Sequence, residues 1–568
     1  MPELTGKLDT PVNGPEGLPP FGGDAWDQVD WRRHEEQVRR LRGRIFKAVQ
    51  EGDWPLARNV QKLMLRSWSN TLVSVRQVTQ RNAGRRTAGI DGLVALTSQA
   101  RAEMAVQVHA TIGSHQPSPV RRVYIPKASD KTKMRPLGIP VISDRCHQAR
   151  VRNALEPEWE ARFEPRSYGF RPGRGCHDAI ESLYNTLHGK SRRVWILDAD
   201  LAGAFDKISH GHLLEMLGGF PARDMIAGWL KAGIFEAGKG FAPAGEGTPQ
   251  GGVISPLLLN IALHGLEEAA GVRYRTGVHA GDVRDGCPAL TRYADDLVVC
   301  CHSRQQAEQV QARLAGWLEP RGLAFNEAKT RIVPLSEGFD FLGFNLRRYP
   351  NGKLLIKPGV MAIKRFRNRL AKEVRALRGA NVAAVLAKIV PITRGWVAYY
   401  RTVVSSRVFR ALDNYLWKLT YKWACWSHSN KPKGWIVGRY FRKFEKFRND
   451  RLLAATLSAH RLAAFDVHVL AGRCWWCGGR FGAGVVKEAG ERVDDVEEQR
   501  VDAGLLIGGV LGAEAAGKAV PLCGCLLLVL GGLVPGLVSG LPPAQCLGAD
   551  QAAGGGLGVS AGRLVSRG

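Results

Sequence analysis

The sequence predicts an α+β fold followed by a low-complexity carboxyl-terminal segment. Short runs rich in β-branched and aromatic residues, such as 194–200 and 297–300, are typical of buried strands. Longer basic stretches at 26–80 and 360–450 have the apolar spacing of amphipathic helices. Residues 481–568 differ from both, because they hold 20 glycines in 88 residues. A chain of 568 residues is long enough for three or four domains with cores of their own.

The amino-terminal part divides into two segments. Residues 1–25 are rich in Pro and Gly without periodicity, which predicts disorder, and no signal peptide is visible there. Residues 26–110 form a basic extension, of which residues 26–80 are expected to fold as helices with a turn at Gly52 and Asp53.

Acidic residues gather at the ends of two expected strands. In the first, Asp198 and Asp200 have period-two spacing and so share one face. In the second, Asp295 and Asp296 precede an apolar run and are typical of a hairpin tip. Placed side by side, these strands would form a three-carboxylate site for two Mg²⁺ ions, which prefer oxygen ligands and lie roughly 4 Å apart in two-metal phosphoryl transfer. Taken alone, two adjacent Asp residues have a simpler interpretation, because Asp favours turns through local hydrogen bonds.

Five further motifs surround the acidic clusters. They are YIPK with a basic turn at 124–140, SYGFRPGR at 167–174, GTPQGGVISPLLLN at 247–260, LAFNEAKT at 323–330 and FDFLGF at 339–344. In this order, the segment 111–350 resembles the fingers and palm of reverse transcriptases encoded by group II introns. The resemblance implies a right-hand polymerase that makes DNA on an RNA template.

The resemblance assigns the catalytic chemistry to three carboxylates and one lysine. Asp200 and Asp295 match the Mg²⁺ ligands, Asp296 matches a supporting carboxylate, and Lys329 matches a residue that protonates the leaving pyrophosphate. Such a general acid must lie within hydrogen-bond reach of its target. Phe205 matches the aromatic ring that lies under the incoming sugar and leaves no room for a 2′-hydroxyl. Without the acidic pattern, Phe205 would be interpreted as a core residue.

The resemblance also implies contacts to nucleotide phosphates and to the template. Lys127 and Arg135 match the cations of a fingers hairpin that grips the triphosphate, and both side chains suit phosphate oxygens. Arg171 and Arg174 match template contacts. The simpler alternative for such cations is an exposed, solvated basic turn.

Gln250 and Gly251 match a loop beneath the nascent base pair, where glycine permits close backbone approach. A helix is expected to start at Ser255 and Pro256, since Ser as a cap and Pro at the first position are favoured. An ordinary turn before a helix explains the same residues.

Residues 351–450 resemble the thumb and maturase domain, called domain X, of group II intron proteins. A basic amphipathic helix opens this segment, and ITRGWVAYYR at 392–401 matches the motif of the domain. Interleaved basic and aromatic residues bind structured RNA by charge and stacking, and they can equally build a helical core, where Trp396 and Tyr400 are expected. The candidate RNA contacts are Lys364, Arg365, Arg394 and Arg401.

The carboxyl-terminal part departs from the family pattern. Residues 451–479 are expected to be a DNA-binding remnant ending in CWWCGG, the start of a truncated His-Asn-His-like domain. No histidine follows His468, so neither zinc binding nor DNA cleavage is expected. Residues 480–568 form a Gly/Ala/Leu-rich tail that we interpret as the product of a shifted reading frame. Glycines and prolines interrupt its uncharged run at 519–548, so no membrane span is expected.

The composition indicates a polyanionic partner. The chain has 80 Lys and Arg against 52 Asp and Glu, whereas residues 480–568 hold 7 basic and 9 acidic side chains, so the positive surplus lies in the first 479 residues. The resemblance implies intron RNA, an RNA template, a DNA primer or target and deoxynucleoside triphosphates as partners, and a homodimer is left open. Eleven scattered cysteines without a visible secretion signal fit a reducing cytoplasm, with association to the nucleoid during mobility.

Two other functions remain open at this point. A polymerase-dead, RNA-binding splicing maturase is disfavoured by the intact Asp200, Asp295 and Asp296. A reverse transcriptase of host defence or diversity generation is disfavoured by the domain X match. The prediction is therefore an RNA-directed DNA polymerase that also binds its intron RNA to promote splicing and retrohoming, without a functional endonuclease.

Overall fold

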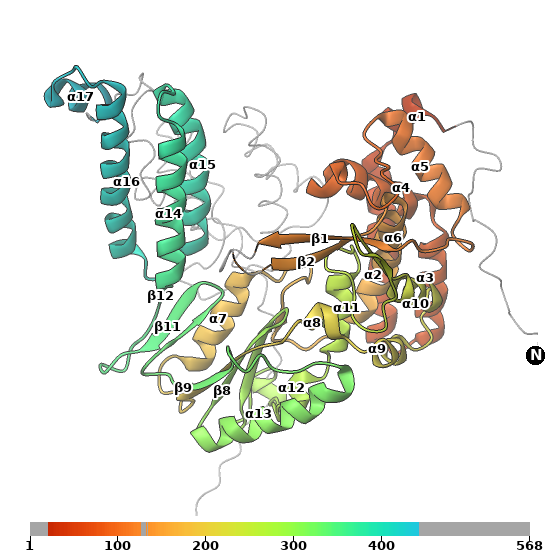
Figure 1. Ribbon diagram of the computed structural model, residues 1–568. Coiled ribbons are helices and arrows are strands. Elements are labelled where there is room, and N and C mark those ends of the chain that lie inside the picture. The colour runs from red at the N-terminus through yellow and green to blue at the C-terminus, as the bar shows by residue number, and fades with distance from the viewer. Residues whose placement is uncertain (1–20, 127–131, 133, 442–568) are drawn as a thin grey trace, which may run out of the picture. The chain divides into compact units, whose positions relative to one another are not determined.

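The computed structural model describes residues 21–126, 132 and 134–441 (Figure 1). Lys127 lies outside the described residues, as do the predicted nuclease remnant and the Gly/Ala/Leu-rich tail. The predicted disorder of residues 1–25 is wrong for its last residues, because α1 (Gly23–Asp27) is helical and buries Trp26 against a core of neighbouring helices.

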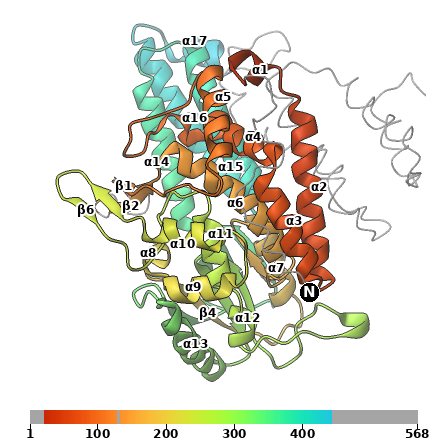
Figure 2. The ribbon, with the colours of Figure 1, turned by 90° about the vertical axis from the view of Figure 1, so that its right-hand side faces the viewer.

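The amino-terminal extension is helical, as predicted, and its helices begin at residues that cap them. The Asp30 carboxylate accepts a hydrogen bond from the Arg33 amide, and that of Asp53 accepts one from the Leu56 amide. Gly52 makes the predicted turn with a φ of +74°. Two of these helices, α2 and α3, pack side by side (Figure 2). The segments are α2 (Trp31–Gln50), α3 (Trp54–Arg66), α4 (Trp68–Arg76), η1 (Gln77–Arg81), η2 (Ala83–Arg86) and α5 (Ser98–Ala110).

The fingers contain a four-stranded sheet with the order β2-β1-β5-β6. Its first two strands form the predicted basic hairpin, in which Arg135 pairs with Ile125 across an antiparallel ladder. The strands are β1 (Val120–Pro126), β2 (Met134–Ile139), β5 (Ile234–Glu236) and β6 (Gly240–Ala242).

The palm contains a five-stranded sheet with the order β3-β7-β8-β4-β9. Its two central strands are fully buried at Ile196, Leu197, Val298 and Val299, which explains their apolar sequences. The strands are β3 (Ser167–Tyr168), β4 (Trp195–Asp200), β7 (Ala289–Tyr293), β8 (Asp296–Cys301) and β9 (Arg331–Pro334). The adjacent Cys300 and Cys301 are buried free thiols.

Helices pack against the palm sheet and join it to the fingers. Among them, α13 contacts β4, β8 and β9, and α7 contacts β7. The segments are α6 (Ile142–Glu160), α7 (Cys176–Leu187), α8 (Ala204–Lys207), α9 (His210–Leu217), α10 (Arg223–Lys231), α11 (Ser255–Ala262), α12 (Leu266–Ala269), η3 (Gly277–His279), α13 (Arg304–Leu318) and η4 (Glu319–Arg321).

The thumb follows a three-stranded sheet with the order β10-β11-β12. Leu342 and Gly343 form the two-residue turn of its first hairpin, and both have positive φ, as a type I′ turn requires. The elements are β10 (Phe339–Phe341), β11 (Phe344–Arg348), β12 (Leu354–Pro358), α14 (Val360–Ala376), α15 (Val382–Tyr400), α16 (Ser406–Ser427) and α17 (Lys433–Tyr440).

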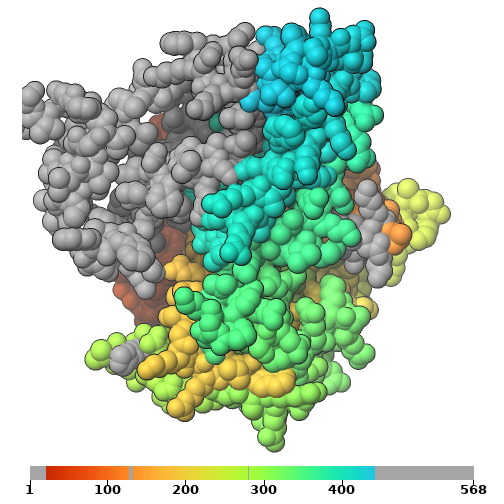
Figure 3. Space-filling model, turned by 90° about the vertical axis from the view of Figure 1, so that its left-hand side faces the viewer, coloured from red at the N-terminus to blue at the C-terminus, as the bar shows by residue number. Residues whose placement is uncertain are grey.

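Three hydrogen bonds fasten the thumb to this turn. The Tyr399 hydroxyl donates to the Leu342 carbonyl over 2.8 Å, and the Tyr400 hydroxyl donates to the Gly343 carbonyl over 3.2 Å. The Gly359 amide also donates to the Gly343 carbonyl, over 2.8 Å. On the face drawn in Figure 3, the thumb in cyan meets the green segment that holds this hairpin.

The apolar helix α15 belongs to the thumb core. By length and composition alone, it is the helix among the described residues that could cross a membrane. Val385, Ile389 and Val397 are nevertheless buried within the cluster that includes residues of α14 and α16. Its apolar character is therefore explained by packing, and Tyr400 is buried as predicted.

Candidate active site

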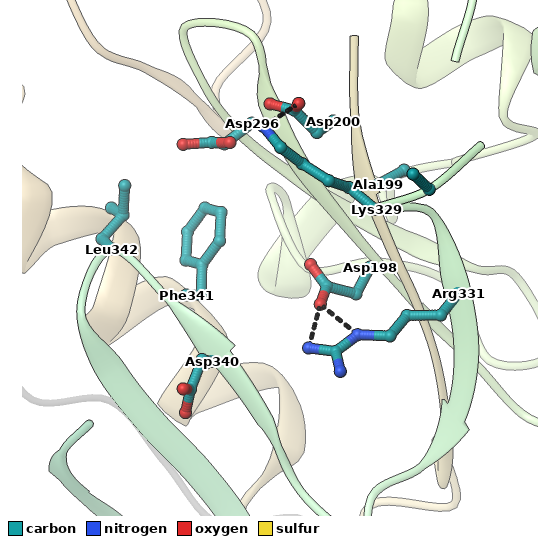
Figure 4. Close-up of a pocket in the computed structure, with 10 residues that line it drawn as sticks. Asp198, Ala199, Asp200, Asp296, Lys329, Arg331, Asp340, Phe341 and Leu342 are labelled. Atoms are coloured by element: carbon teal, nitrogen blue, oxygen red, sulfur yellow. Dashed lines mark hydrogen bonds and ion pairs between the residues drawn. The ribbon is translucent and has the colours of Figure 1, made fainter. Parts of the chain in front are cut away.

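The register of the palm sheet brings the two acidic motifs together. Asp200, the last residue of β4, pairs directly with Asp296, the first residue of β8. Asp198 lies two residues earlier on β4, and all three acids line one open cavity of about 380 Å³ (Figure 4). The predicted shared face of Asp198 and Asp200 is thus confirmed.

Asp295 is presented by a tight hairpin turn. Tyr293 pairs with Asp296, which leaves Ala294 and Asp295 as a two-residue loop. Ala294 has a φ of +57°, and Asp295 is not among the non-glycine residues with positive φ. This combination is that of a type II′ turn, in which glycine is favoured at the position that Ala294 occupies.

Hydrogen bonds with buried polar groups hold the Ala294–Asp295 turn in place. The Arg292 guanidinium donates to the Ala294 carbonyl over 3.1 Å, and also to the Asn260 side-chain oxygen and the Ser167 hydroxyl. The Ala294 amide donates to the Tyr168 carbonyl over 3.1 Å. Arg292 and Asn260 are almost fully buried, so their polar groups are used within the protein.

Sequence reasoning missed Arg292 and Asn260 as supports of the hairpin. A signal was present, since each is a polar residue inside a run that is otherwise typical of a buried element. A buried polar side chain requires a partner, and the two residues are 32 positions apart and bonded to each other.

The carboxylates of Asp200, Asp295 and Asp296 repel one another. Burial, followed by the charges of Asp295 and Asp200, raises the pKa of Asp296 to about 7. Burial and Asp200 also raise the pKa of Asp295, while Arg135 and Lys329 oppose that shift. Like charges held together in a partly desolvated site favour protonation or a bound cation.

A lysine ammonium already supplies one positive charge. Lys329 Nζ lies 2.5 Å from Asp200 Oδ2, and the Asn326 amide group donates to the same oxygen over 3.3 Å. The bridge between Leu201 and Phe325 places this motif beside the end of β4. Asp198 is paired separately with Arg331 at 3.1 Å (Figure 4).

The donor set fits a hard divalent cation, although the described residues contain no cluster of three or more His, Cys, Asp or Glu side chains already arranged around one point. Carboxylate oxygens are the preferred ligands of such ions. Burial and the neighbouring carboxylates raise the pKa values of Asp295 and Asp296, and a bound cation would offset both effects. Asp200, Asp295 and Asp296 are the residues that could hold the ion.

Gln250 and Gly251, two of the predicted nucleotide-binding residues, lie in the loop between β6 and α11, which contacts both α8 and β2. Gln250 donates from its side chain to Asp206 over 3.2 Å and accepts from the Gly138 amide over 2.8 Å. Gly251 lies so close to Gly138 that a Cβ atom would be 2.7 Å from the Gly138 carbonyl oxygen. The half-buried Phe205 stands edge to face with the exposed Phe170, with ring centroids 6.2 Å apart.

The helix that follows this loop begins at Ser255, as predicted. The residue that caps the amino-terminal end of this helix is not the predicted Ser255. Ile254 is the N-cap residue, and the Ser255 hydroxyl donates instead to the Pro249 carbonyl over 2.8 Å. This bond ties the loop to the helix start.

The structure contradicts one predicted template contact. Arg171 is buried, pairs with Glu160 at 2.9 Å, and donates to the carbonyls of Glu164 and Ser167. It therefore supports the fold and cannot reach a phosphate. Arg174 is half-buried and donates to the Pro165 carbonyl, while Arg135 is exposed on the fingers hairpin.

The candidate RNA-binding residues of the thumb differ in exposure. Lys364, Arg365 and Arg394 are exposed, whereas Arg401 is half-buried. Trp396 packs among aromatic rings, including Phe366 at a centroid distance of 4.7 Å. The expected helical core with a basic outer face is present.

The fold and the site together define a right-hand, template-directed nucleic-acid polymerase. Residues 125–346 match the model of reverse transcriptase (RNA-dependent DNA polymerase), and residues 26–108 match the N-terminal domain of reverse transcriptase. Residues 363–441 match the maturase-specific domain of group II introns. The chain belongs to the group II intron reverse transcriptase and maturase family, and it is an RNA-directed DNA polymerase.

Curated relatives agree with this family. Protein YkfC of Escherichia coli is 36% identical over 52% of this chain and 84% of its own length. The group II intron-encoded protein LtrA of Lactococcus lactis is 42% identical over 28% of this chain and 26% of its own length. Maturase-like protein 1 of Euglena gracilis is 26% identical over 65% of this chain and 76% of its own length.

Proposed function

We propose that this polymerase uses two Mg²⁺ ions held by Asp200, Asp295 and Asp296. The observation that carries the proposal is the convergence of these acids at the end of β4 and the β7–β8 hairpin. Bound ions would stabilise both the attacking and the leaving oxygen of phosphoryl transfer. In this proposal, Lys329 releases Asp200 and donates a proton to the leaving pyrophosphate.

The substrates proposed are an RNA template, a DNA primer and deoxynucleoside triphosphates. Arg135, with Lys127 outside the described residues, would bind the triphosphate. Phe205 would exclude a 2′-hydroxyl, and Gln250 and Gly251 would support the nascent base pair. The exposure of Arg135, and its positive charge, which opposes the rise in the pKa of Asp295, support the assignment of Arg135.

We further propose that the thumb binds the RNA of the host intron and thereby promotes splicing and retrohoming. Its exposed cations, including Lys364, Arg365 and Arg394, support this role, with Arg174 and Arg401 as additional contacts. In this proposal the chain has no functional endonuclease, and DNA at a replication fork supplies the primer. The protein would then act in the cytoplasm and at the nucleoid.

The test is primer extension on an RNA template with deoxynucleotides over a range of Mg²⁺ concentrations. Asp295→Asn should abolish extension at every concentration. Asp340→Asn is the matched control, because Asp340 lines the cavity that Asp200 and Asp296 also line but accepts a hydrogen bond from Asn345. Full activity of folded Asp295→Asn, or equal losses in both variants, would contradict the proposed metal ligands.

A further inference from the structure

A cysteine and a histidine meet at the junction of palm and thumb. Cys176 is the first residue of α7, and its Sγ lies 3.7 Å from Nδ1 of His177. His177 Nε2 lies 2.8 Å from the carbonyl oxygen of Tyr399 in α15. Because a carbonyl only accepts, Nε2 carries the proton of this bond, and Nδ1 is left to accept a proton from the thiol.

The surroundings favour the charged form of this pair. Burial opposes ionisation of Cys176, but interactions with His177 and Tyr399 lower the pKa of the thiol below its usual value. The bond to Cys176 raises the pKa of His177, and Asp178 contributes in the same direction. The start of a helix also favours a thiolate. The neighbouring Tyr293, Tyr399 and Tyr400 all have raised pKa values and stay neutral.

Other cysteines in the described part of the chain lack this arrangement. Burial raises the pKa of Cys146, Cys300 and Cys301 to about 12. Cys287 and Cys425 are half-buried, as Cys176 is, but within the described part of the chain neither thiol is hydrogen-bonded to a histidine, since His302 contacts only the backbone of Cys287. They therefore serve as internal references for a reactive thiol.

We propose that Cys176 and His177 form a nucleophilic dyad that is a modification site for small electrophiles of the hydroperoxide class. A nucleophile, a base and a carbonyl that orients the base are the parts that such chemistry needs. The thiolate attacks one peroxide oxygen, so that an S–O bond forms and the O–O bond breaks. Cys176 is oxidised to a sulfenic acid, and the departing oxygen takes the proton from His177 and leaves as water or an alcohol.

The position of the dyad links this modification to polymerisation. Tyr399, which contacts both Cys176 and His177, also bonds the turn at Leu342. Phe344 stacks on the Tyr399 ring at a centroid distance of 5.0 Å. An added oxygen on Cys176 would be forced against this contact, so oxidation is expected to lower primer extension.

The first experiment measures thiol reactivity in the full chain and does not depend on polymerase activity. Iodoacetamide is added at pH 7, and the alkylation of each cysteine is followed by peptide mass spectrometry. Cys176 should react at least about tenfold faster than Cys287 and Cys425, because more of it is thiolate. His177→Gln, which keeps a donor for the Tyr399 carbonyl, should remove this advantage. Equal rates for the three cysteines in the wild-type protein would overturn the dyad.

The second experiment adds hydrogen peroxide and measures Cys176 sulfenic acid and primer extension together. Wild-type extension should fall as the sulfenic acid forms and recover after a thiol reductant is added. Cys176→Ser, which resembles the native side chain in size, should keep its activity under the same treatment. Equal inhibition of Cys176→Ser, or full wild-type activity with Cys176 oxidised, would overturn the link to polymerisation. Neither result would bear on the metal ligands.

Discussion

Lys329 is the cation that pairs directly with Asp200 in the acidic site. Lys329→Ala should slow nucleotide incorporation by about 10²- to 10⁴-fold, the usual contribution of a general acid. Lys329→Arg can restore the ion pair with Asp200 but gives up a proton far less readily, so it should stay slow. Single-turnover incorporation of one deoxynucleotide measures both rates. An alanine variant within twofold of the wild type would exclude the proton-transfer role.

The buried His109 side chain should make the free energy of unfolding depend on pH. Burial, followed by the charge of Arg150, lowers its pKa to about 4, and Thr71 lies 3.0 Å from its Nδ1 atom. The unfolded chain binds a proton near pH 6.5, so the free energy of unfolding is fully retained above that pH. It should decrease as the pH falls from about 6.5 to about 4.

Urea unfolding at pH 7.5 and at pH 5 measures this loss. His109→Gln does not titrate and should lose less stability between the two pH values than the wild type. Part of the dependence should remain, because burial also lowers the pKa of His147 well below its usual value. The same loss in both proteins would assign the dependence to other groups.

At the scale of elements, the catalytic hairpin also makes a close backbone contact with Gly169. Gly169 has a φ of +76°, and a Cβ atom there would lie 2.6 Å from the Ala294 amide nitrogen. Gly189 has a similar φ of +63°, but nothing lies within 4 Å of its Cβ position. Replacing Gly189 by Ala therefore measures the cost of backbone strain without a steric clash. Gly189→Ala should destabilise the protein by about 1–2 kcal/mol.

Gly169→Ala should destabilise the protein further and should also displace the Ala294–Asp295 turn. We therefore expect a higher Mg²⁺ concentration for half-maximal primer extension in this variant only. Denaturant unfolding and a Mg²⁺ titration separate the two effects. An unchanged Mg²⁺ requirement in Gly169→Ala would mean that the turn keeps its position without this contact.

Local patterns predicted the elements that carry the acids. Strand alternation placed Asp198 and Asp200 on one sheet face, and the position of Asp295-Asp296 at a strand boundary indicated a hairpin tip. The family resemblance, not alternation, brought the two motifs into one site. Arg171 was misassigned because its partner Glu160 lies at the end of α6, and sequence proximity does not show which arginine a carboxylate will bind. The Arg292 support was missed for the same reason, since Ser167 is 125 residues away.

At the scale of the whole molecule, the positive charge predicts salt-sensitive binding of RNA. A protein with six to ten phosphate contacts loses about 10³- to 10⁵-fold in affinity between 50 and 200 mM salt. Replacing Lys364 and Arg365 together by Ala should reduce the slope of log affinity against log salt by about 1.4 to 1.8. The exposed Lys190 and Lys231, which lie outside the thumb, give the matched control. Equal slopes for the two double variants would exclude a thumb contact.

The fastening of the thumb to the turn at Leu342 and Gly343 has a mechanical consequence. Tyr399, Tyr400 and Gly359 donate hydrogen bonds to the carbonyls of Leu342 and Gly343, so the thumb helices are attached directly to this turn. Leu342 itself lines the acidic cavity. A displacement of the thumb helices is therefore expected to move Leu342, and with it one wall of the cavity that Asp200 and Asp296 line.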